Sequence, residues 1–391
     1  MGVRDLVVRW AVRRPHVLPV EVPGQWRLRA LLDHELALRD WPVASSPADA
    51  DILAVCGQPG PQLSSAVDVV WDQMPGPRVR TPVTDGDGIG AALDDAVAAL
   101  RDTHRDDPRE PGPPHGEEDS GESHSHMESH SDMESHSDMA PAGIPLAEGA
   151  EDRDGLEMDV LHVRLGPILP HWPGGFVLCC ELHGDVIAGA EALRLDAGQY
   201  PAAGGHNASA AGGHNASAAG GHNASAAGGH NASAAGGHRM SATSDDNVSA
   251  ARQCDHILDV LDLAGWPGAA ERARRARDAL LAGNDPAETA ALLDDLELAV
   301  RRSHVLRWSL RGLATLSPED LRRRGLPATW AGDAHDRLLR RITHARESIA
   351  PEVIDADTFG SLPDIVAGLD VAAARVVIAG LGIDAAGHAT R

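Results

Sequence analysis

Cysteine is scarce in this chain, which has only four among 391 residues. Cys56 and Cys254 stand alone and Cys179 and Cys180 are adjacent, so the C-x-x-C spacing that chelates zinc or an iron–sulfur cluster is absent. Four cysteines are also too few for a disulfide scaffold, which favours a reducing compartment. Adjacent residues alternate to opposite faces of a strand, so we interpret Cys179 and Cys180 as packing residues rather than as a redox pair.

Basic residues are outnumbered, and long apolar runs are missing. The chain has 34 Lys and Arg against 58 Asp and Glu, a formal charge of −24 that repels phosphate backbones and excludes nucleic acid as an expected partner. The longest apolar stretch, Leu362–Ala386, includes charged residues that each cost about 2.5 to 3.5 kcal/mol at mid-bilayer. The start of the chain lacks the apolar core and cleavage site of a signal peptide. We therefore expect a cytoplasmic protein with no direct membrane span.

Composition shifts divide the chain into five segments. We expect an α/β domain over residues 1–105, a disordered His/Met-rich linker over 106–150, a β-hairpin region over 151–199, a flexible AAGGHNAS repeat insertion over 200–247 and a helical domain over 248–391. The predicted fold class is an α/β N-terminal domain with a short parallel sheet and flanking helices. An α+β C-terminal part, a hairpin with a helical bundle, follows after the low-complexity segments.

The N-terminal domain alternates strand and helix patterns. Val17–Val22 and Asp51–Cys56 are short apolar runs bounded by turn residues, whereas Trp26–Arg39, Gln62–Met74 and Ile89–Leu100 carry apolar residues at helical spacing. Nearly continuous apolar strands are typical of a parallel sheet covered on both faces.

The C-terminal part begins with strand patterns and continues as helices. Gly184-Asp185 predicts a tight turn between the strands Phe176–His183 and Val186–Leu195, preceded by a strand at Leu161–Leu165. The expected helices, packed as a bundle on the hairpin, are Ile257–Ala264, Ala269–Ala282, Pro286–Leu313, Ser317–Arg324, Asp333–Ile349 and Leu362–Leu381.

Two low-complexity repeats contain many of the histidines. The first repeat, HSHMESHSDMESHSDM, presents His124, His126, His130 and His136 together with Met127, Met133 and Met139. Imidazole and thioether suit Cu(I), and imidazole suits Ni(II), so a metal-handling role is one hypothesis; the alternative is a linker that tolerated a repeat. For the histidines of AAGGHNAS, which recur every eight residues, repeat expansion of a flexible loop is favoured.

One stretch resembles a known redox family. Residues 47–57, with the run DILAVC, are followed by VDVVWDQMPGPR at 67–78. The strand, the loop length and the Met-Pro-x-Pro ending are together similar to the 20-kDa-type subunit of respiratory complex I and the small subunit of nickel–iron hydrogenases. The resemblance implies a domain that holds a 4Fe–4S cluster through cysteines. Here the first of those positions corresponds to residues 23–26, Pro-Gly-Gln-Trp, and residues 81–90 contain no thiol either.

A weaker resemblance follows in the second half. Residues 165–170, LGPILP, and the strands after them are similar to the opening of the 49-kDa-type complex I subunit and the hydrogenase large subunit. The family's quinone-associated histidine corresponds to Leu169, and its second histidine to Pro173. The cysteine pairs that bind nickel and iron in the large subunit have no counterpart here. We carry over no site from the family to the helical remainder, which includes RRSHVLRWSLRG at 301–312.

Other polar residues suggest only weak sites. His162, His171 and His183 with Asp185 have no specific metal-ligand spacing, so packing or surface roles are favoured. Asp49 and Asp51 are expected to cap or to lie exposed, since the first is in a turn and the second opens a strand.

We assign no catalytic, cofactor-binding or metal residue and no cofactor. The preferred hypothesis is a degenerate, fused structural or assembly subunit of a complex-I-like (NADH:quinone oxidoreductase-like) or energy-converting hydrogenase-like complex. Its expected partners are subunits of that membrane-associated oxidoreductase, and its expected location is the cytoplasm, peripheral to the inner face of the membrane. The alternatives are an active NADH dehydrogenase or hydrogenase-type subunit that relies on ligands from a partner chain, and the metal-handling protein.

Overall fold

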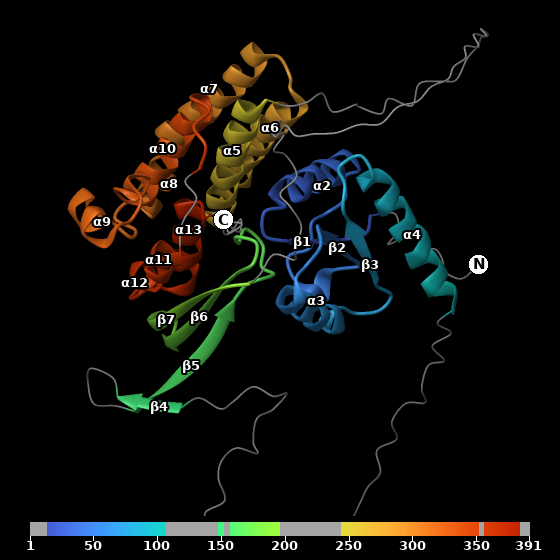
Figure 1. The fold of residues 1–391 in the computed structure, drawn as a ribbon, viewed down its shortest axis with the longest axis horizontal. Coiled ribbons are helices and arrows are strands. Elements are labelled where there is room, and N and C mark those ends of the chain that lie inside the picture. Colours follow the sequence, from blue (N-terminus) through green and yellow to red (C-terminus); the bar gives the residue numbers. More distant parts are fainter. Residues whose placement is uncertain (1–13, 107–147, 152–156, 196–243, 352–355, 384–391) are drawn as a thin grey trace, which may run out of the picture.

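The computed structural model confirms the predicted fold class: a three-stranded parallel sheet with flanking helices precedes an antiparallel sheet with a helical region (Figure 1). The structure describes residues 14–106, 148–151, 157–195, 244–351 and 356–383. Most of the predicted linker and of the repeat insertion, including every histidine of the two repeats, lies outside the described residues.

The parallel sheet has the order β1-β2-β3, with Ile52 of β2 opposite Val17 of β1 and Val79 of β3. Its strands are β1 (Val17–Glu21), β2 (Ile52–Cys56) and β3 (Val79–Val83), and its helices are α2 (Trp26–Leu38), α3 (Pro61–Gln73) and α4 (Ile89–Asp106). All five residues of β2 are buried, because α2 and α4 cover one face of the sheet and α3 covers the other. This two-sided burial explains why β2 is an uninterrupted apolar run.

The antiparallel sheet has its strands in chain order. They are β4 (Glu148–Glu151), β5 (Glu157–Leu165), β6 (Phe176–His183) and β7 (Val186–Arg194). The predicted hairpin is confirmed, and Gly184 at its turn has φ +65°, a conformation that favours glycine.

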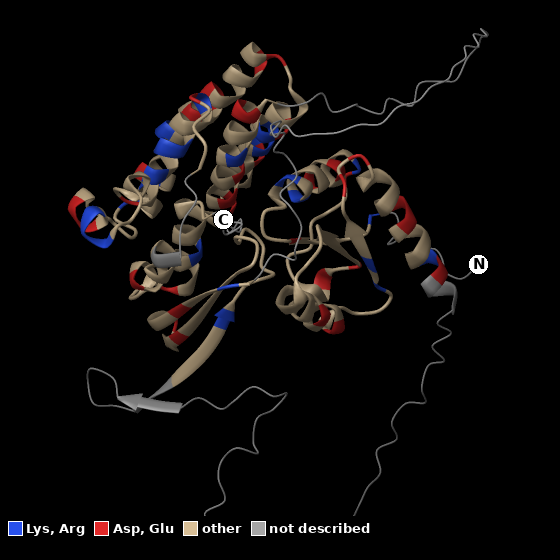
Figure 2. Ribbon diagram, viewed as in Figure 1, with Lys and Arg blue, Asp and Glu red and all other residues tan. Residues whose placement is uncertain are grey.

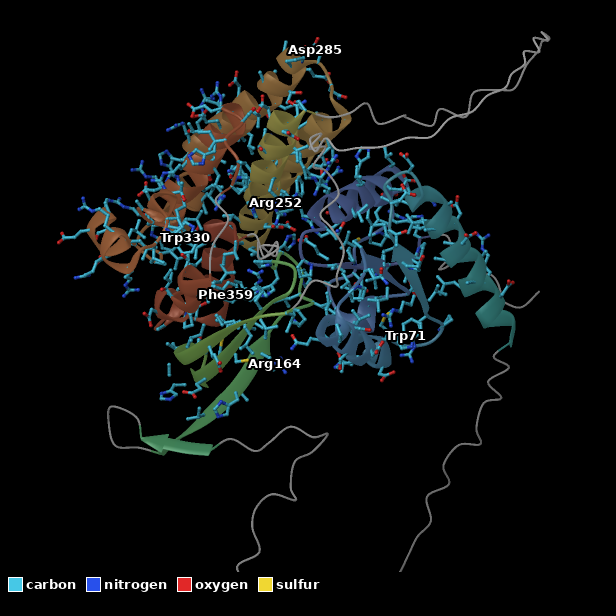
Figure 3. The ribbon with its side chains drawn as sticks, in the orientation of Figure 1. Trp71, Arg164, Arg252, Asp285, Trp330 and Phe359 are labelled. Atoms are coloured by element: carbon cyan, nitrogen blue, oxygen red, sulfur yellow. The ribbon has the colours of Figure 1, made fainter. Side chains whose placement is uncertain are left out.

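The remaining elements form the helical region. They are α5 (Asp245–Leu263), α6 (Pro267–Ala282), α7 (Pro286–Arg302), α8 (His304–Leu310), α9 (Pro318–Arg324), α10 (Ala334–Arg346), α11 (Ala356–Gly360), α12 (Leu362–Val366) and α13 (Val371–Leu381), with short 3-10 turns at Pro47–Asp49 and Ala328–Trp330. One core joins this region to the hairpin, as predicted: Phe176 of β6 lies edge-on against Phe359 of α11, and Trp330 belongs to the same cluster (Figure 3).

Several predicted element boundaries are wrong. Helix α5 begins at Asp245 instead of Ile257, because Ser244 caps it and its first turns bury polar side chains. The expected helix Pro286–Leu313 breaks at Ser303, which ends α7 and whose side chain caps α8. The expected helix Leu362–Leu381 breaks near Gly368, where φ is +80°.

Three further features were not expected. Strand β3 completes the parallel sheet, although alternate exposure of its residues weakens its apolar pattern. Helix α4 continues to Asp106, past Leu100, and β4 occupies the end of the predicted linker.

Helix α2 belongs to both halves of the molecule. Its Leu32 and Leu36 pack on the parallel sheet, whereas Trp26 and Ala30 pack among residues of α5 and α6, including Cys254. The joint between the halves is therefore a shared core. Within the described ranges, no helix is long and apolar enough to cross a bilayer.

Candidate functional site

A cluster of buried ion pairs lies at the joint between the two halves. Arg29 of α2 donates from Nε to Glu21 Oε2 at the end of β1 (2.7 Å) and from Nη1 to Asp33 Oδ2 one turn along α2 (2.7 Å). Its Nη2 donates to Asp255 of α5. All three donor nitrogens of Arg29 thus hold carboxylates, and one of these belongs to the other half of the chain.

Asp255 is the centre of this cluster. Its side chain is fully buried and also accepts from Arg252 Nη1 (2.8 Å) and Arg277 Nη1 (2.9 Å). Burial alone would raise the pKa of Asp255, but the charges of Arg29, Arg277 and Arg252 outweigh it and hold that pKa far below its usual range. The carboxylate is therefore ionised and neutralised inside the protein.

Two arginines of the helical region extend the cluster to α2. Arg277 contacts Asp33 (3.2 Å) and donates to the backbone oxygen of Ala30 (3.4 Å). Arg252 places its guanidinium over the ring of Trp26, 5.0 Å from the centroid, and Figure 3 labels it on α5. Charged and apolar contacts between the halves thus converge on the same face of α2.

His171 makes a second connection, which joins the antiparallel sheet to helix α5. It lies in the loop between β5 and β6 at φ +57°, and its Nδ1 and Nε2 are 3.0 Å and 2.8 Å from carboxylate oxygens of Asp259 and Asp262 on α5. Burial would lower the pKa of His171, but hydrogen bonds and charge from the two aspartates raise it to about 10. At neutral pH the imidazole is therefore a cation that holds the loop on the helix.

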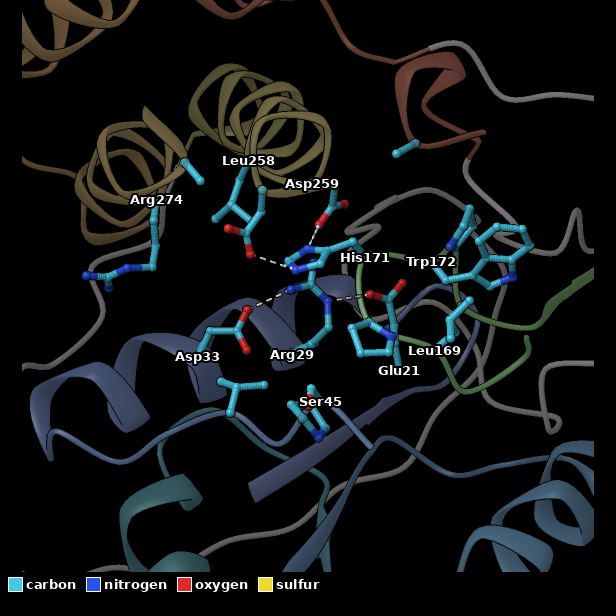
Figure 4. Close-up of a pocket in the computed structure, with 18 of the residues that line it drawn as sticks. Glu21, Arg29, Asp33, Ser45, Leu169, His171, Trp172, Leu258, Asp259 and Arg274 are labelled. Atoms are coloured by element: carbon cyan, nitrogen blue, oxygen red, sulfur yellow. Dashed lines mark hydrogen bonds and ion pairs between the residues drawn. The ribbon is translucent and has the colours of Figure 1, made fainter. Parts of the chain in front are cut away.

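A cavity of about 520 Å³ opens between these connections (Figure 4). Its walls come from β1, α2, the loop before β6, α5, α6 and the end of α13. Apolar side chains form much of the surface, among them Leu18, Leu36, Ile168, Leu169 and Ile378. The polar lining includes Glu21, Arg29, Asp33, His171, His256 and Arg274. This combination of apolar walls and a few polar groups is typical of small-molecule sites.

His256 is the polar group of the cavity lining whose bonding is incomplete. It is 4 % exposed, and its Nε2 has no hydrogen-bond partner among the described residues. Burial, together with Arg252 and Arg341, lowers the pKa of His256, so the imidazole is neutral. Elsewhere in the cavity lining, burial raises the pKa of Glu21 although Arg29 opposes it. A neutral ligand with one hydroxyl or carbonyl group would complete the bonding of His256.

The four thiols do not come together. Cys56 lies in β2, Cys179 and Cys180 in β6, and Cys254 in α5, and all are free. Burial raises the pKa of Cys254 to about 12 and that of Cys180 to about 11. Among the residues that the structure describes, no group of three His, Cys, Asp or Glu side chains is arranged to hold a metal ion.

The other polar residues that were singled out from the sequence and that the structure describes do not line the cavity. His162 and His183 lie on β5 and β6, apart from the His171 loop. Asp51 Oδ2 accepts from the backbone N–H of His16 (2.8 Å), and Asp49 Oδ1 contacts His16 Nδ1 (2.8 Å), so both aspartates cap the start of β1 as expected.

The residues of the ion-pair cluster were not predicted from the sequence. Arg29 and Asp33 are four residues apart on a helix, a spacing that also occurs on solvated surfaces. A usable signal was present in α5, where Arg252, Asp255 and His256 lie between Ala250-Ala251 and Ile257-Leu258 in a helical pattern. Charged residues at positions that should be buried indicate partners elsewhere in the fold.

Comparison with protein-family models, with curated proteins and with solved structures finds no match for the chain.

Proposed function

We propose that this chain is a non-catalytic structural or assembly subunit of a complex-I-like or energy-converting hydrogenase-like oxidoreductase, located at the inner face of the membrane. In this proposal the first half derives from the small, cluster-bearing subunit and the second half from the large subunit. The chain keeps their mutual packing and has lost their metal ligands.

The observation that carries the proposal is the Arg29–Asp255 connection within a shared core. Segments that resemble two separate subunits meet through buried, fully paired charges and through Trp26 and Ala30. Buried ion pairs are costly unless every partner is in place, so the two surfaces are complementary in detail. A framework that retains such complementarity can serve as a docking platform for other subunits.

The distribution of the thiols supports the same proposal. At the positions of the family cysteines, Trp26 lies under the guanidinium of Arg252, and Gln25 is the residue before α2. Leu169, at the position of the family histidine, is part of the cavity wall. In the proposal, residues that bind metal or quinone in the family are thus replaced by residues that make other contacts within the chain.

An assembly role can be tested because it changes the amount of assembled oxidoreductase without changing the activity of each assembled complex. In native cells lacking this chain, the quantity of the assembled membrane oxidoreductase and its activity should fall in proportion, and the tagged chain should co-purify with membrane-arm subunits. The Cys179→Ser variant should restore both as well as the wild-type chain does. A purified chain that is brown and loaded with iron and sulfide, or a complex that assembles fully without the chain but is inactive, would contradict the proposal.

A second candidate function is favoured by the cavity. Its apolar walls and the unpartnered Nε2 of His256 suit a quinone carbonyl, as in an active quinone-linked subunit that takes its cluster ligands from a partner chain. A soluble quinone analogue should then bind the wild-type chain, and His256→Leu should weaken binding about fivefold to tenfold through the lost hydrogen bond. His335→Leu is the matched control, because His335 is also buried with an unpartnered Nε2 but lies outside the cavity lining. Equal binding to the two variants would rule out this use of His256.

A further inference from the structure

Helix α8 presents an unusual outward face. Leu306 and Leu310 point into the helical core and are 4 % and 2 % exposed, whereas Val305 and Trp308 are 76 % and 83 % exposed. At about 100° per residue, Trp308 lies almost opposite the midpoint of the two buried leucines. It is the most exposed large apolar side chain of the described residues.

Basic side chains surround this tryptophan. Residues 301–324 contain seven arginines and two acidic residues, in a chain whose formal charge is −24 and which has no lysine. Figure 2 shows basic positions on α9 and along the helices beside it. Arg301 is paired with Glu297, and Arg323 with Asp320. No carboxylate of the described residues pairs with Arg302, Arg307 or Arg311, so three guanidinium groups near Trp308 are free.

The neighbouring carboxylates are already engaged. Asp333 accepts from the backbone N–H groups of Gly312 (2.9 Å) and Asp336 (2.9 Å), while Asp336 completes the same capping box at the start of α10. Neither aspartate forms an ion pair with an arginine of the described residues, although both remain negatively charged nearby. The outward face is defined by Arg302 at the end of α7, by Val305, Arg307 and Trp308 of α8, and by Arg311 just after it. It combines three arginines that form no ion pair among the described residues with a protruding indole.

We propose that this outward face binds the surface of an anionic phospholipid membrane. Guanidinium groups pair with phosphate in a bidentate way, and tryptophan is enriched where a protein meets the lipid headgroup layer. The face is a protrusion on a short helix, which suits shallow insertion into a headgroup layer. The inference gives a physical basis to the membrane location in the proposed function, but binding to lipid requires no oxidoreductase partner.

The negative net charge of the chain means that attraction to an anionic membrane can arise only from a local basic region. A molecule with a formal charge of −24 has no general attraction to an anionic surface. Because the Debye length is about 8 Å at physiological salt, acidic residues on other faces neither assist nor strongly oppose contact through this face. Any dependence on anionic lipid must then come from a local basic region.

The test is co-sedimentation of the full chain with vesicles. The wild type should bind vesicles of equal parts phosphatidylcholine and phosphatidylglycerol and should not bind phosphatidylcholine alone. Each basic residue at an anionic surface contributes about a fivefold gain in partitioning, so Arg302→Gln/Arg307→Gln/Arg311→Gln should lose about a hundredfold. Trp308→Ser should lose about tenfold through the lost burial of its indole.

Matched controls are available on other faces. Arg101→Gln/Arg164→Gln/Arg194→Gln removes three exposed charges elsewhere, and Leu38→Ser removes an apolar side chain that is 69 % exposed on α2. Both should bind like the wild type, and circular dichroism should show that all variants are folded. A wild type that ignores anionic vesicles, or an arginine triple variant that still binds them, would overturn the proposal. A third result would also overturn it: the chain does not bind vesicles, but co-purifies with a protein partner in a way that depends on Trp308. The outward face would then be a protein-contact surface.

Discussion

Arg29 of α2 and Asp255 of α5 form a buried ion pair although they are 226 positions apart in the sequence. The aspartate has no exposed surface, and the arginine is only 17 % exposed. Each side chain removes the charge that would otherwise make the burial of the other prohibitive. The pair therefore couples the folding of the parallel sheet to that of the helical region.

Replacing the central carboxylate should destabilise the whole chain. Asp255→Asn leaves three buried arginines short of one negative charge, and breaking a buried pair costs about 3 to 5 kcal/mol. The free energy of unfolding, measured by urea denaturation, should fall by about that amount. Asp94→Asn, whose side chain is 71 % exposed beside Arg39, is the control and should change it by less than about 1 kcal/mol. Similar losses in both variants would show that the buried carboxylate of Asp255 contributes no more stability than an exposed one.

The His171 connection should make stability depend on pH in the alkaline range. The pKa of His171 is raised to about 10 in the folded protein, against about 6.5 in the unfolded chain. The folded state thus retains a proton that the unfolded state releases. Its stabilising contribution is complete below pH of about 6.5 and is lost as the pH rises toward about 10. Unfolding measured from pH 7 to 10 should show a steeper decline for the wild type than for His171→Gln. His162→Gln, exposed on β5, should follow the wild type.

The turn before the His171 loop should not tolerate a side chain. Gly166 has φ +86°, and a Cβ there would lie 2.3 Å from both the Phe176 oxygen and Trp172 Nε1, which are hydrogen-bonded to each other. Gly166→Ala should therefore cost more than about 2 kcal/mol of stability. Gly184→Ala has a similar positive φ but open space, so it should cost only about 1 kcal/mol. Equal melting temperatures for the two variants would contradict the steric explanation.

Native thiol reactivity should be confined to one position. Cys56, Cys180 and Cys254 are buried, whereas Cys179 is half-buried on the other face of β6. Iodoacetamide followed by peptide mass spectrometry should modify Cys179 first in the folded chain and all four cysteines in urea. Rapid modification of Cys254 under native conditions would indicate that α5 opens at the joint.

Local patterns were sufficient where burial depends on apolar side chains. Strand β2 and helix α3 were predicted nearly to the residue, because two-sided burial leaves a continuous apolar run and one-sided burial leaves a periodic one. The first turns of α5 were missed because Arg252 and Asp255 have polar side chains and are nevertheless buried. They pair with each other, but the partners that make their burial possible, Trp26 and Arg29 of α2 and Arg277 of α6, lie outside any local window. The cavity could not be predicted for the same reason, since its walls come from both halves.

The division of charge across the joint has a consequence for synthesis of the protein. The arginines and carboxylates that neutralise each other are contributed by residues before and after the long middle segment, so either portion, once released alone, would lose partners of its buried charges. A single polypeptide supplies both in equal number and at high local concentration. Because both portions are made as one polypeptide, their supply is matched during synthesis, and a truncated product would lack partners for some of its buried charges.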